Sequence, residues 1–334
     1  MPNSPTHIAH NAQRPAMAGL CAVAMAMLMA ACTGHHSEVR FSRFERLLFD
    51  TPAAQLQEEL FKHRAEYDSP LLNVAPADAQ YMQLLQGFVA DSTMRYVYHV
   101  TDSLFHDLDQ VEQQLGKALA RAEKLLPGMH YDRFYTLLTG DYDNYAGRVF
   151  CDQQSLCISL DHYALPHMQR YQAFGVPLYL QRMLREEYIV PDCMAAVARA
   201  HIALPDGAMT VLDYAVAEGK TLYFVEKTLS SCPDTLLLRY SPAQLKWMQE
   251  NVQNVWGWLL HNRALFTSDF TTLHNLTDEA PKTNAFGDGS APRTTAYIGL
   301  QIVRAYMKKK HVGMKELFDL TDSRQILNDS GWRP

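Results

Sequence analysis

An uncharged apolar run near the N-terminus constrains this chain more than any other feature. Residues 16–31 carry no charged side chain, are rich in Ala, Met and Leu, and end beside Cys32. A membrane-spanning helix needs about 20 apolar residues, so the run is short for that role. Its length, its position and its small final residues are typical of an export signal. We therefore predict that residues 1–31 form a signal peptide and that the mature protein is exported.

The residues beside the predicted cleavage site indicate lipid attachment. Leu28, Met29, Ala30 and Ala31 precede Cys32 in a pattern that resembles the lipobox of bacterial lipoproteins, whose cysteine is acylated and becomes the new N-terminus. Several acyl chains give a lasting anchor, because each buried methylene contributes ~0.8 kcal/mol. The alternatives are a plain secretory signal, with Cys32 as a free thiol, and an uncleaved anchor.

The rest of the chain has the composition of an ordinary globular protein. Apolar residues make up 48% and charged residues 20% of the chain, which excludes a disordered chain or a coiled coil for the bulk of it. The net charge of −6 shows no excess of basic residues of the kind that binds nucleic acid, so nucleic acid is not an expected partner. We expect a tether at residues 32–40 and a single domain at 41–334, since no long linker interrupts that stretch.

Helical periodicity dominates the expected domain. Between the helices, residues 133–138, 147–151 and 156–160 are aromatic or β-branched and are separated by turn residues, which predicts two or three antiparallel strands. Ser241 and Gln244 have the spacing of a helical capping box. The expected fold class is α+β, mainly helical, with a small antiparallel sheet in the middle. Helices are expected at residues 53–67, 78–89, 104–126, 177–188, 192–202, 207–229, 241–265, 294–310 and 314–320.

Four cysteines remain after Cys32, and an exported chain meets an oxidising compartment. Cys151 and Cys157 flank a short polar turn between two expected strands. Hairpin strands can bring two cysteines within bonding distance, so this pair is one possible disulfide. Cys193 and Cys232 form the other possible pair. Neither pair has the two-residue spacing of a zinc knuckle or a thioredoxin-like motif.

Common catalytic motifs are missing, including the serine nucleophile elbow, the phosphate loop and the dinucleotide fingerprint. Two expected helices carry acids, at Glu186-Glu187 and at Glu218. Gluzincin-type zinc peptidases similarly have two histidines and a glutamate on one helix and a glutamate ligand on a later one. Arg185 and Ile189 stand where the histidines belong. One interpretation is therefore a degenerate gluzincin-like scaffold, with no metal and no cofactor.

Several segments resemble the gliding-motility-associated lipoprotein GldB family of Bacteroidetes. No single motif is decisive, but their order covers nearly the whole mature chain and follows a lipobox. Ala291-Pro292-Arg293 departs from the Pro-Gly-Arg of the family. The segments that carry the resemblance lie at residues 43–49, 159–163, 177–179, 187–192, 218–220, 241–247, 290–293, 297–299 and 326–334.

The resemblance implies an exported, lipid-anchored protein that acts as a non-enzymatic accessory or binding component of the gliding and type IX secretion-linked machinery. Its partner would be an envelope protein or a cell-wall component, reached from the outer membrane or from the periplasmic face of the inner membrane. Together with the two acidic segments, the resemblance gives a candidate pocket of Glu186, Glu187, Asp192, Glu218, Lys220, Tyr223 and Arg293.

Two alternatives remain open. One is a metal-dependent peptidase-like enzyme with unusual ligands drawn from His162, His167, Glu186, Glu187 and Glu218. The other is a purely structural lipoprotein, in which Glu187, Glu218 and Lys220 are dispensable.

Overall fold

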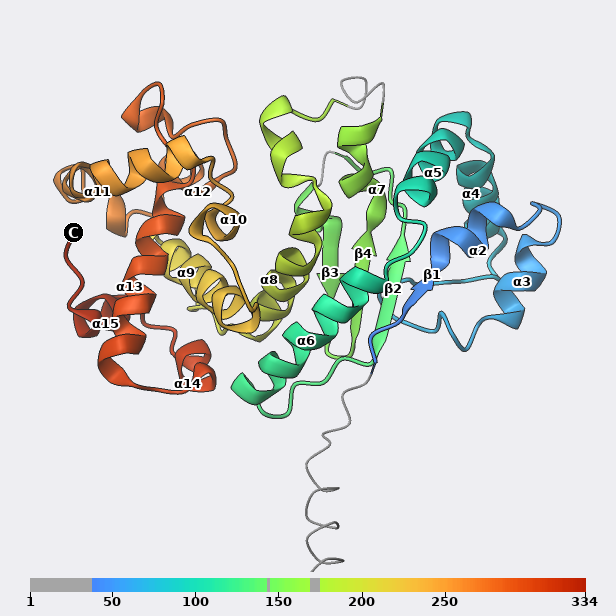
Figure 1. Ribbon diagram of the computed structural model, residues 1–334, viewed down its shortest axis with the longest axis horizontal. Helices are drawn as coiled ribbons and strands as arrows, with labels where there is room; N and C mark the ends of the chain where they lie inside the picture. Colours follow the sequence, from blue (N-terminus) through green and yellow to red (C-terminus); the bar gives the residue numbers. More distant parts are fainter. Residues whose placement is uncertain (1–37, 143–144, 169–174) are drawn as a thin grey trace, which may run out of the picture. The chain divides into compact units, whose positions relative to one another are not determined.

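A small mixed sheet lies among the helices of the protein (Figure 1). The computed structural model describes residues 38–142, 145–168 and 175–334, so the predicted signal peptide and Cys32 lie outside the described residues. The strands follow the order β1 (Phe41–Arg43), β2 (Arg133–Leu137), β4 (Ser155–Ser159) and β3 (Val149–Cys151). β1, β2 and β4 run parallel, and only β3 is antiparallel to its neighbour.

The predicted antiparallel sheet is therefore confirmed only in part. Its three strands are present, and β3 and β4 form an antiparallel pair, but β2 runs parallel to β4. β4 is buried along its whole length, and residues Phe134, Tyr135 and Thr136 of β2 are buried on both faces of the sheet. Burial on both faces is typical of parallel strands covered by helices. β1 was not predicted, because three residues are too few to show alternation.

Helices before and around the sheet cover its faces. α6 buries Val111, Leu115, Ala118, Leu119 and Ala122 at helical spacing. It contacts α8 (Ile189–His201) and α9 (Val211–Thr228). α4 and α5 each begin at an aspartate whose carboxylate accepts two backbone N–H groups. These helices are α2 (Phe44–Asp50), α3 (Leu56–Lys62), α4 (Ala79–Ala90), α5 (Ser92–Leu104), α6 (Asp109–Leu125) and α7 (Leu160–Ala164).

The second half of the described chain is almost entirely helical. The predicted capping box at Ser241 and Gln244 is confirmed, and Thr210 with Asp213 forms another at the start of α9. The helices are α8 (Ile189–His201), α9 (Val211–Thr228), α10 (Asp234–Leu238), α11 (Pro242–His261), α12 (Phe270–Thr277), α13 (Thr294–Lys310), α14 (Met314–Asp319) and α15 (Ser323–Ser330).

α9 and α13 approach each other closely at two glycines. A Cβ atom on Gly299 would overlap the carbonyl oxygen of Ala215, and one on Gly219 would overlap the carbonyl oxygen of Gly299. Glycine is required at both positions because the two backbones touch. The crossing fixes Glu218, beside Gly219, relative to the first turn of α13.

The predicted helix over residues 177–188 is wrong. The chain instead makes two 3-10 turns, Leu178–Met183 and Glu186–Tyr188, and Arg185 between them is extended at φ −115° and ψ 153°. Arg185 and Ile189, the two histidine positions, consequently do not lie four residues apart on one α-helix, as the zinc-peptidase motif requires. The helix that faces the second acidic segment is α8, which begins only at Ile189.

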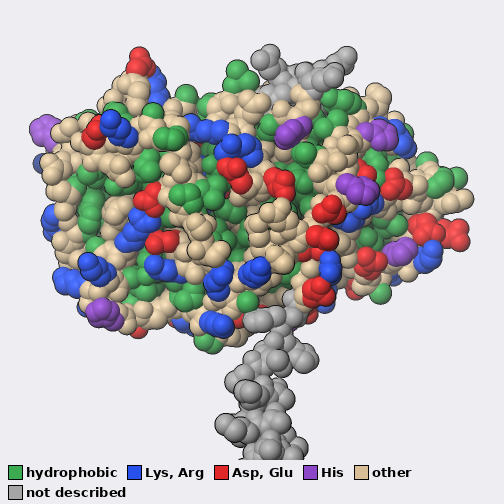
Figure 2. All heavy atoms as spheres, viewed as in Figure 1, with side chains coloured by type: hydrophobic (Ala, Val, Ile, Leu, Met, Phe, Trp, Pro, Cys, Tyr) green, Lys and Arg blue, Asp and Glu red, His purple; other side chains and the backbone are tan. Residues whose placement is uncertain are grey.

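No helix in the described part of the chain is long and apolar enough to cross a membrane. Figure 2 shows acidic and basic side chains interspersed on the face in view.

Candidate functional site

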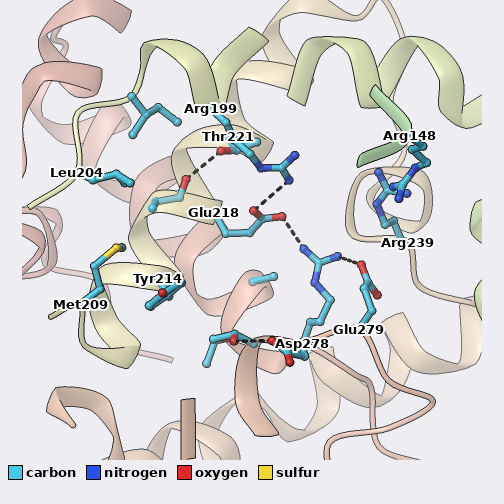
Figure 3. A pocket seen from close by; sticks show the side chains of 16 residues that line it. Arg148, Arg199, Leu204, Met209, Tyr214, Glu218, Thr221, Arg239, Asp278 and Glu279 are labelled. Atoms are coloured by element: carbon cyan, nitrogen blue, oxygen red, sulfur yellow. Dashed lines mark hydrogen bonds and ion pairs between the residues drawn. The ribbon is translucent and has the colours of Figure 1, made fainter. Parts of the chain in front are cut away.

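A cavity of about 780 Å³ lies among α8, α9, α12 and the start of α13 (Figure 3). Small-ligand sites commonly have volumes of ~300–1,000 Å³. Arginines, acids and apolar side chains all contribute to its wall. The lining residues are Arg148, Arg199, Ile202, Leu204, Met209, Tyr214, Ala217, Glu218, Thr221, Arg239, Thr277, Asp278, Glu279, Arg293, Thr295 and Ala296.

Asp192 holds two of the cavity arginines. Its carboxylate is 4% exposed, and Arg148 Nε donates to Asp192 Oδ2 at 2.6 Å. The guanidinium of Arg239 pairs with Oδ1, and the hydroxyl of Tyr163 donates to Oδ2 at 2.6 Å. Burial alone would raise the pKa of Asp192, but Arg148 and Arg239 hold that pKa below its usual value. One buried carboxylate is thus shared by two guanidinium groups.

Glu218 holds the other two arginines. Arg293 Nη2 donates to Glu218 Oε1 at 2.5 Å, and Arg199 Nη2 donates to Oε2 at 3.4 Å. Arg293 also donates through Nη1 to Glu279 Oε1 at 2.7 Å. Burial opposes ionisation of Glu218, but Arg199 and Arg293 more than offset it, and its pKa is lowered. Figure 3 shows Glu218 between Arg199 and Glu279, with these bonds drawn as dashed lines.

Two of the cavity arginines sit on left-handed backbone. Arg239 has φ +60° at the C-terminal cap of α10, and Arg293 has φ +47° immediately before α13. This conformation costs a residue with a Cβ about 1–2 kcal/mol, so it persists only where the surrounding structure imposes it. Such strain is common at functional sites.

The charges at the cavity balance among the described residues. Four guanidinium groups, of Arg148, Arg199, Arg239 and Arg293, face the three carboxylates of Asp192, Glu218 and Glu279. Asp278 supplies a fourth carboxylate to the lining, and its partner His274, 2.6 Å away, is charged only when protonated. The described wall therefore has four cationic and four anionic groups.

The structure brings together three of the seven predicted pocket residues. Glu218 and Arg293 line the cavity, and Asp192 lies directly behind two of its arginines. Glu186 and Glu187 are exposed and outside the cavity lining, and Glu187 pairs with Arg185 at 2.5 Å.

Lys220 and Tyr223 also lie outside the cavity lining. Nζ of Lys220 donates to the carbonyl oxygen of Leu320 at 2.6 Å. Burial lowers the pKa of Lys220 to about 8. Tyr223 is half-buried and has the Lys227 ammonium 4.8 Å from its ring centroid. Both residues contribute to packing on α9 rather than to the cavity.

Sequence reasoning missed Arg148, Arg199, Arg239 and Glu279. These residues belong to four separate segments and have no common spacing. Lone arginines on loops and helix ends give no motif, and a left-handed arginine has no signature in the sequence. Asp192, Glu218 and Arg293 were the part of the network that the sequence indicated.

The residues considered as zinc ligands do not converge. Among the residues that the structure describes, no group of three His, Cys, Asp or Glu side chains could hold a metal ion. His162 is buried, with Nε2 3.3 Å from Thr139 Oγ1 and its ring against Tyr142. Burial lowers the pKa of His162. The carboxylate of Glu218 is already occupied by two arginines, which makes it a poor metal ligand.

Neither predicted disulfide is present: Cys151, Cys157, Cys193 and Cys232 are all free thiols. In the β3–β4 ladder, Leu156 is opposite Cys151, and Phe150 is opposite Cys157. The two cysteines are therefore offset along the hairpin. Burial raises the pKa of both Cys157 and Cys193.

Comparisons with known proteins give one result. Neither the curated proteins nor the solved structures include a match to this chain. Residues 31–334 match the family described as gliding motility protein GldB. The match begins one residue before Cys32 and reaches the last residue of the sequence. This chain therefore belongs to the GldB family of gliding motility lipoproteins.

Proposed function

We propose that this GldB-family lipoprotein is a non-enzymatic binding component of the gliding and type IX secretion-linked machinery. The observation that carries the proposal is the arginine-rich cavity, a concave site with fixed charges and an apolar wall. The partner is an envelope protein or a cell-wall component that inserts a chemical group into this cavity.

The state of the carboxylates favours binding over catalysis. A general base works best when its pKa lies near the operating pH. Asp192 and Glu218 instead have pKa values below their usual range, because arginines stabilise their charged forms. Each acid is thus suited to holding an arginine in place. The cavity has the properties of a preorganised recognition site.

The attachment to the membrane is part of the same proposal. Residues 1–31 are the signal peptide, Cys32 carries the lipid, residues 32–40 form a tether, and residues 41–334 form one domain. Membership of a lipoprotein family supports this assignment. The anchor lies in the outer membrane or on the periplasmic face of the inner membrane.

A pair of charge reversals tests the role of the cavity. Arg199→Glu reverses the charge of a cavity arginine whose side chain is 57% exposed, so the fold should tolerate it. Arg185→Glu is the matched control, because Arg185 is 52% exposed and lies outside the cavity lining. Both variants, with Cys32→Ala, are introduced into a gliding host that lacks the native gene.

We expect Arg199→Glu to abolish gliding at normal protein levels and Arg185→Glu to preserve it. Cys32→Ala should release the protein from the membrane fraction and also abolish gliding. Normal gliding with Arg199→Glu, at a protein level equal to that of the control, would refute a binding role for the cavity.

A further inference from the structure

We infer that the cavity binds the free α-carboxylate of a peptide, with the carboxylate at Arg239 and the last side chains against Leu204, Met209 and Tyr214. This inference rests on the proposed binding function and names the chemistry of its ligand. It follows from three features of the wall: an unsatisfied guanidinium nitrogen, carboxylates placed beside the arginines, and an apolar region opposite the arginines.

The guanidinium of Arg239 has a vacant donor. Its Nη2 pairs with Asp192, whereas Nη1 is buried and has no hydrogen-bond partner within the described part of the chain. A buried donor without a partner is costly, and a ligand oxygen that accepts from it removes this cost. Arginine presents its N–H groups in a planar fork that matches carboxylate geometry.

The same guanidinium is held in place before any ligand arrives. Left-handed backbone fixes the start of the Arg239 side chain, and Asp192 fixes its end. The guanidinium carbon also lies 5.2 Å from the centroid of the Tyr188 ring. Preorganisation lowers the entropic cost of binding, because the side chain has little freedom left to lose.

The charge balance disfavours a dianion. Four guanidinium groups face four carboxylates, so the described wall has no excess of positive charge to offset two negative charges. A phosphate with two charges would approach Glu218 and Glu279, which repel it more strongly than they repel a single carboxylate. Those two acids can instead accept hydrogen bonds from the N–H groups of a peptide backbone.

The opposite wall of the cavity is apolar. Figure 3 shows Leu204, Met209 and Tyr214 across Glu218 from Arg148 and Arg239. Leu204 is 54% exposed and Tyr214 is 41% exposed, although both are large hydrophobic residues. Exposed apolar side chains that line a cavity are typical of ligand sites. A wall with cations, acids and apolar groups fits a peptide end better than a purely aliphatic acid.

Calorimetric titration of the purified lipidated protein in detergent tests this assignment. The probes are acetyl-Ala-Leu-Leu with a free C-terminal carboxylate, its C-terminal amide, and acetyl-Ala-D-Ala-D-Ala with a free carboxylate. We expect at least one of the two acids to bind, and the amide to bind at least tenfold more weakly than its matching acid. Preference for the L-peptide would indicate a protein C-terminus as the source, and preference for the D-Ala peptide a cell-wall peptide.

Two variants locate the binding. Arg239→Gln should weaken acid binding at least tenfold, whereas Arg263→Gln should leave it unchanged. Arg263 is the matched control, because it also has left-handed backbone, at φ +52°, and lies outside the cavity lining. Leu204→Asp places a charge on the apolar wall at an exposed position, so it should abolish binding without changing the unfolding temperature.

Three results would overturn the assignment: no binding of either acid, equal binding of acid and amide, or undiminished binding by Leu204→Asp. If Arg199→Glu still abolishes gliding in that case, the cavity remains a binding site and only its ligand class is wrong. If Arg199→Glu has no effect either, the proposed function fails with it.

Discussion

The hydroxyl of Tyr240 donates a hydrogen bond to the backbone carbonyl oxygen of Arg293, at 3.1 Å. The same hydroxyl lies 2.8 Å from the carbonyl oxygen of Pro292. Tyr240 directly follows Arg239, so one buried tyrosine joins the two left-handed turns that place arginines in the cavity. The two turns come from segments more than fifty residues apart, and their relative position depends on this contact.

Tyr240→Phe should therefore destabilise the fold and loosen the cavity. The substitution removes the donor to the carbonyl oxygen of Pro292, whereas the carbonyl oxygen of Arg293 still accepts from the Ala296 N–H. Loss of a donor to a buried acceptor costs about 1–3 kcal/mol. Urea unfolding followed by circular dichroism measures the change. Tyr306→Phe is the control, because Tyr306 is also buried and its hydroxyl has no hydrogen bond to another described residue. Equal stability of the two variants would show that the Tyr240 contact contributes nothing.

The glycine contact between α9 and α13 gives a second prediction. Gly299→Ala should cost about 1–3 kcal/mol or more, because the new methyl group overlaps the backbone of Ala215 and forces the helices apart. Gly257→Ala on α11 has open space around its Cβ position and should stabilise the protein by about 0.5–1 kcal/mol. In urea unfolding, the free energy of unfolding should fall for Gly299→Ala and rise for Gly257→Ala. A fall in both variants would contradict the backbone contact.

The sequence reveals the helices of this fold better than its sheet. Long amphipathic segments such as α6 and α13 can be read from spacing alone, and the capping box at Ser241 marks the start of α11. Strand direction cannot be read in the same way. β1 and β2 are separated by about ninety residues, and only tertiary packing makes them parallel neighbours.

The site is visible in the sequence only in part, for a related reason. Glu218 was indicated as the second acidic segment, and Asp192 and Arg293 were indicated by the family resemblance. Arg239 depends on a left-handed turn that no local rule assigns to arginine. The false emphasis on Glu186 and Glu187 came from expecting a helix where extended backbone at Arg185 interrupts the chain.

Removal of the Asp192 carboxylate should cost stability in a pH-dependent way. Asp192→Asn leaves two buried arginines without their counter-charge, and breaking a buried pair costs about 3–5 kcal/mol near pH 7. The pKa of Asp192 is lower in the folded protein than its unfolded value of about 3.9. The stabilisation is therefore present above about pH 4 and is lost as the pH falls.

Urea unfolding of wild type and Asp192→Asn between pH 3 and pH 7 measures this effect. The difference in unfolding free energy should narrow below about pH 4, because a protonated aspartate resembles asparagine. Asp288→Asn removes an ion pair from a side chain that is 96% exposed and should have little effect at any pH. A constant difference for Asp192→Asn across the whole range would contradict the lowered pKa.

The buried ammonium of Lys220 should give a pH dependence of the same sign, but in an alkaline window. Its pKa is about 8 in the folded protein, because burial disfavours the charge, and about 10.4 when unfolded. Between these values the unfolded chain binds more protons, so stability rises with pH through this window. Relative to Lys220→Met, the wild type should gain up to roughly 3 kcal/mol between pH 8 and pH 10.

Urea unfolding of both proteins across that range tests the prediction, since the other titrating groups are common to the two. Lys315→Met is the matched control, because Lys315 is 68% exposed and pairs with Asp319 at the surface. The free energy of unfolding of this control should stay close to that of the wild type across the whole pH range. Parallel pH profiles for wild type and Lys220→Met would show that Lys220 keeps its proton in the folded protein. Its bond to Leu320 would then hold a charged ammonium at the end of α14.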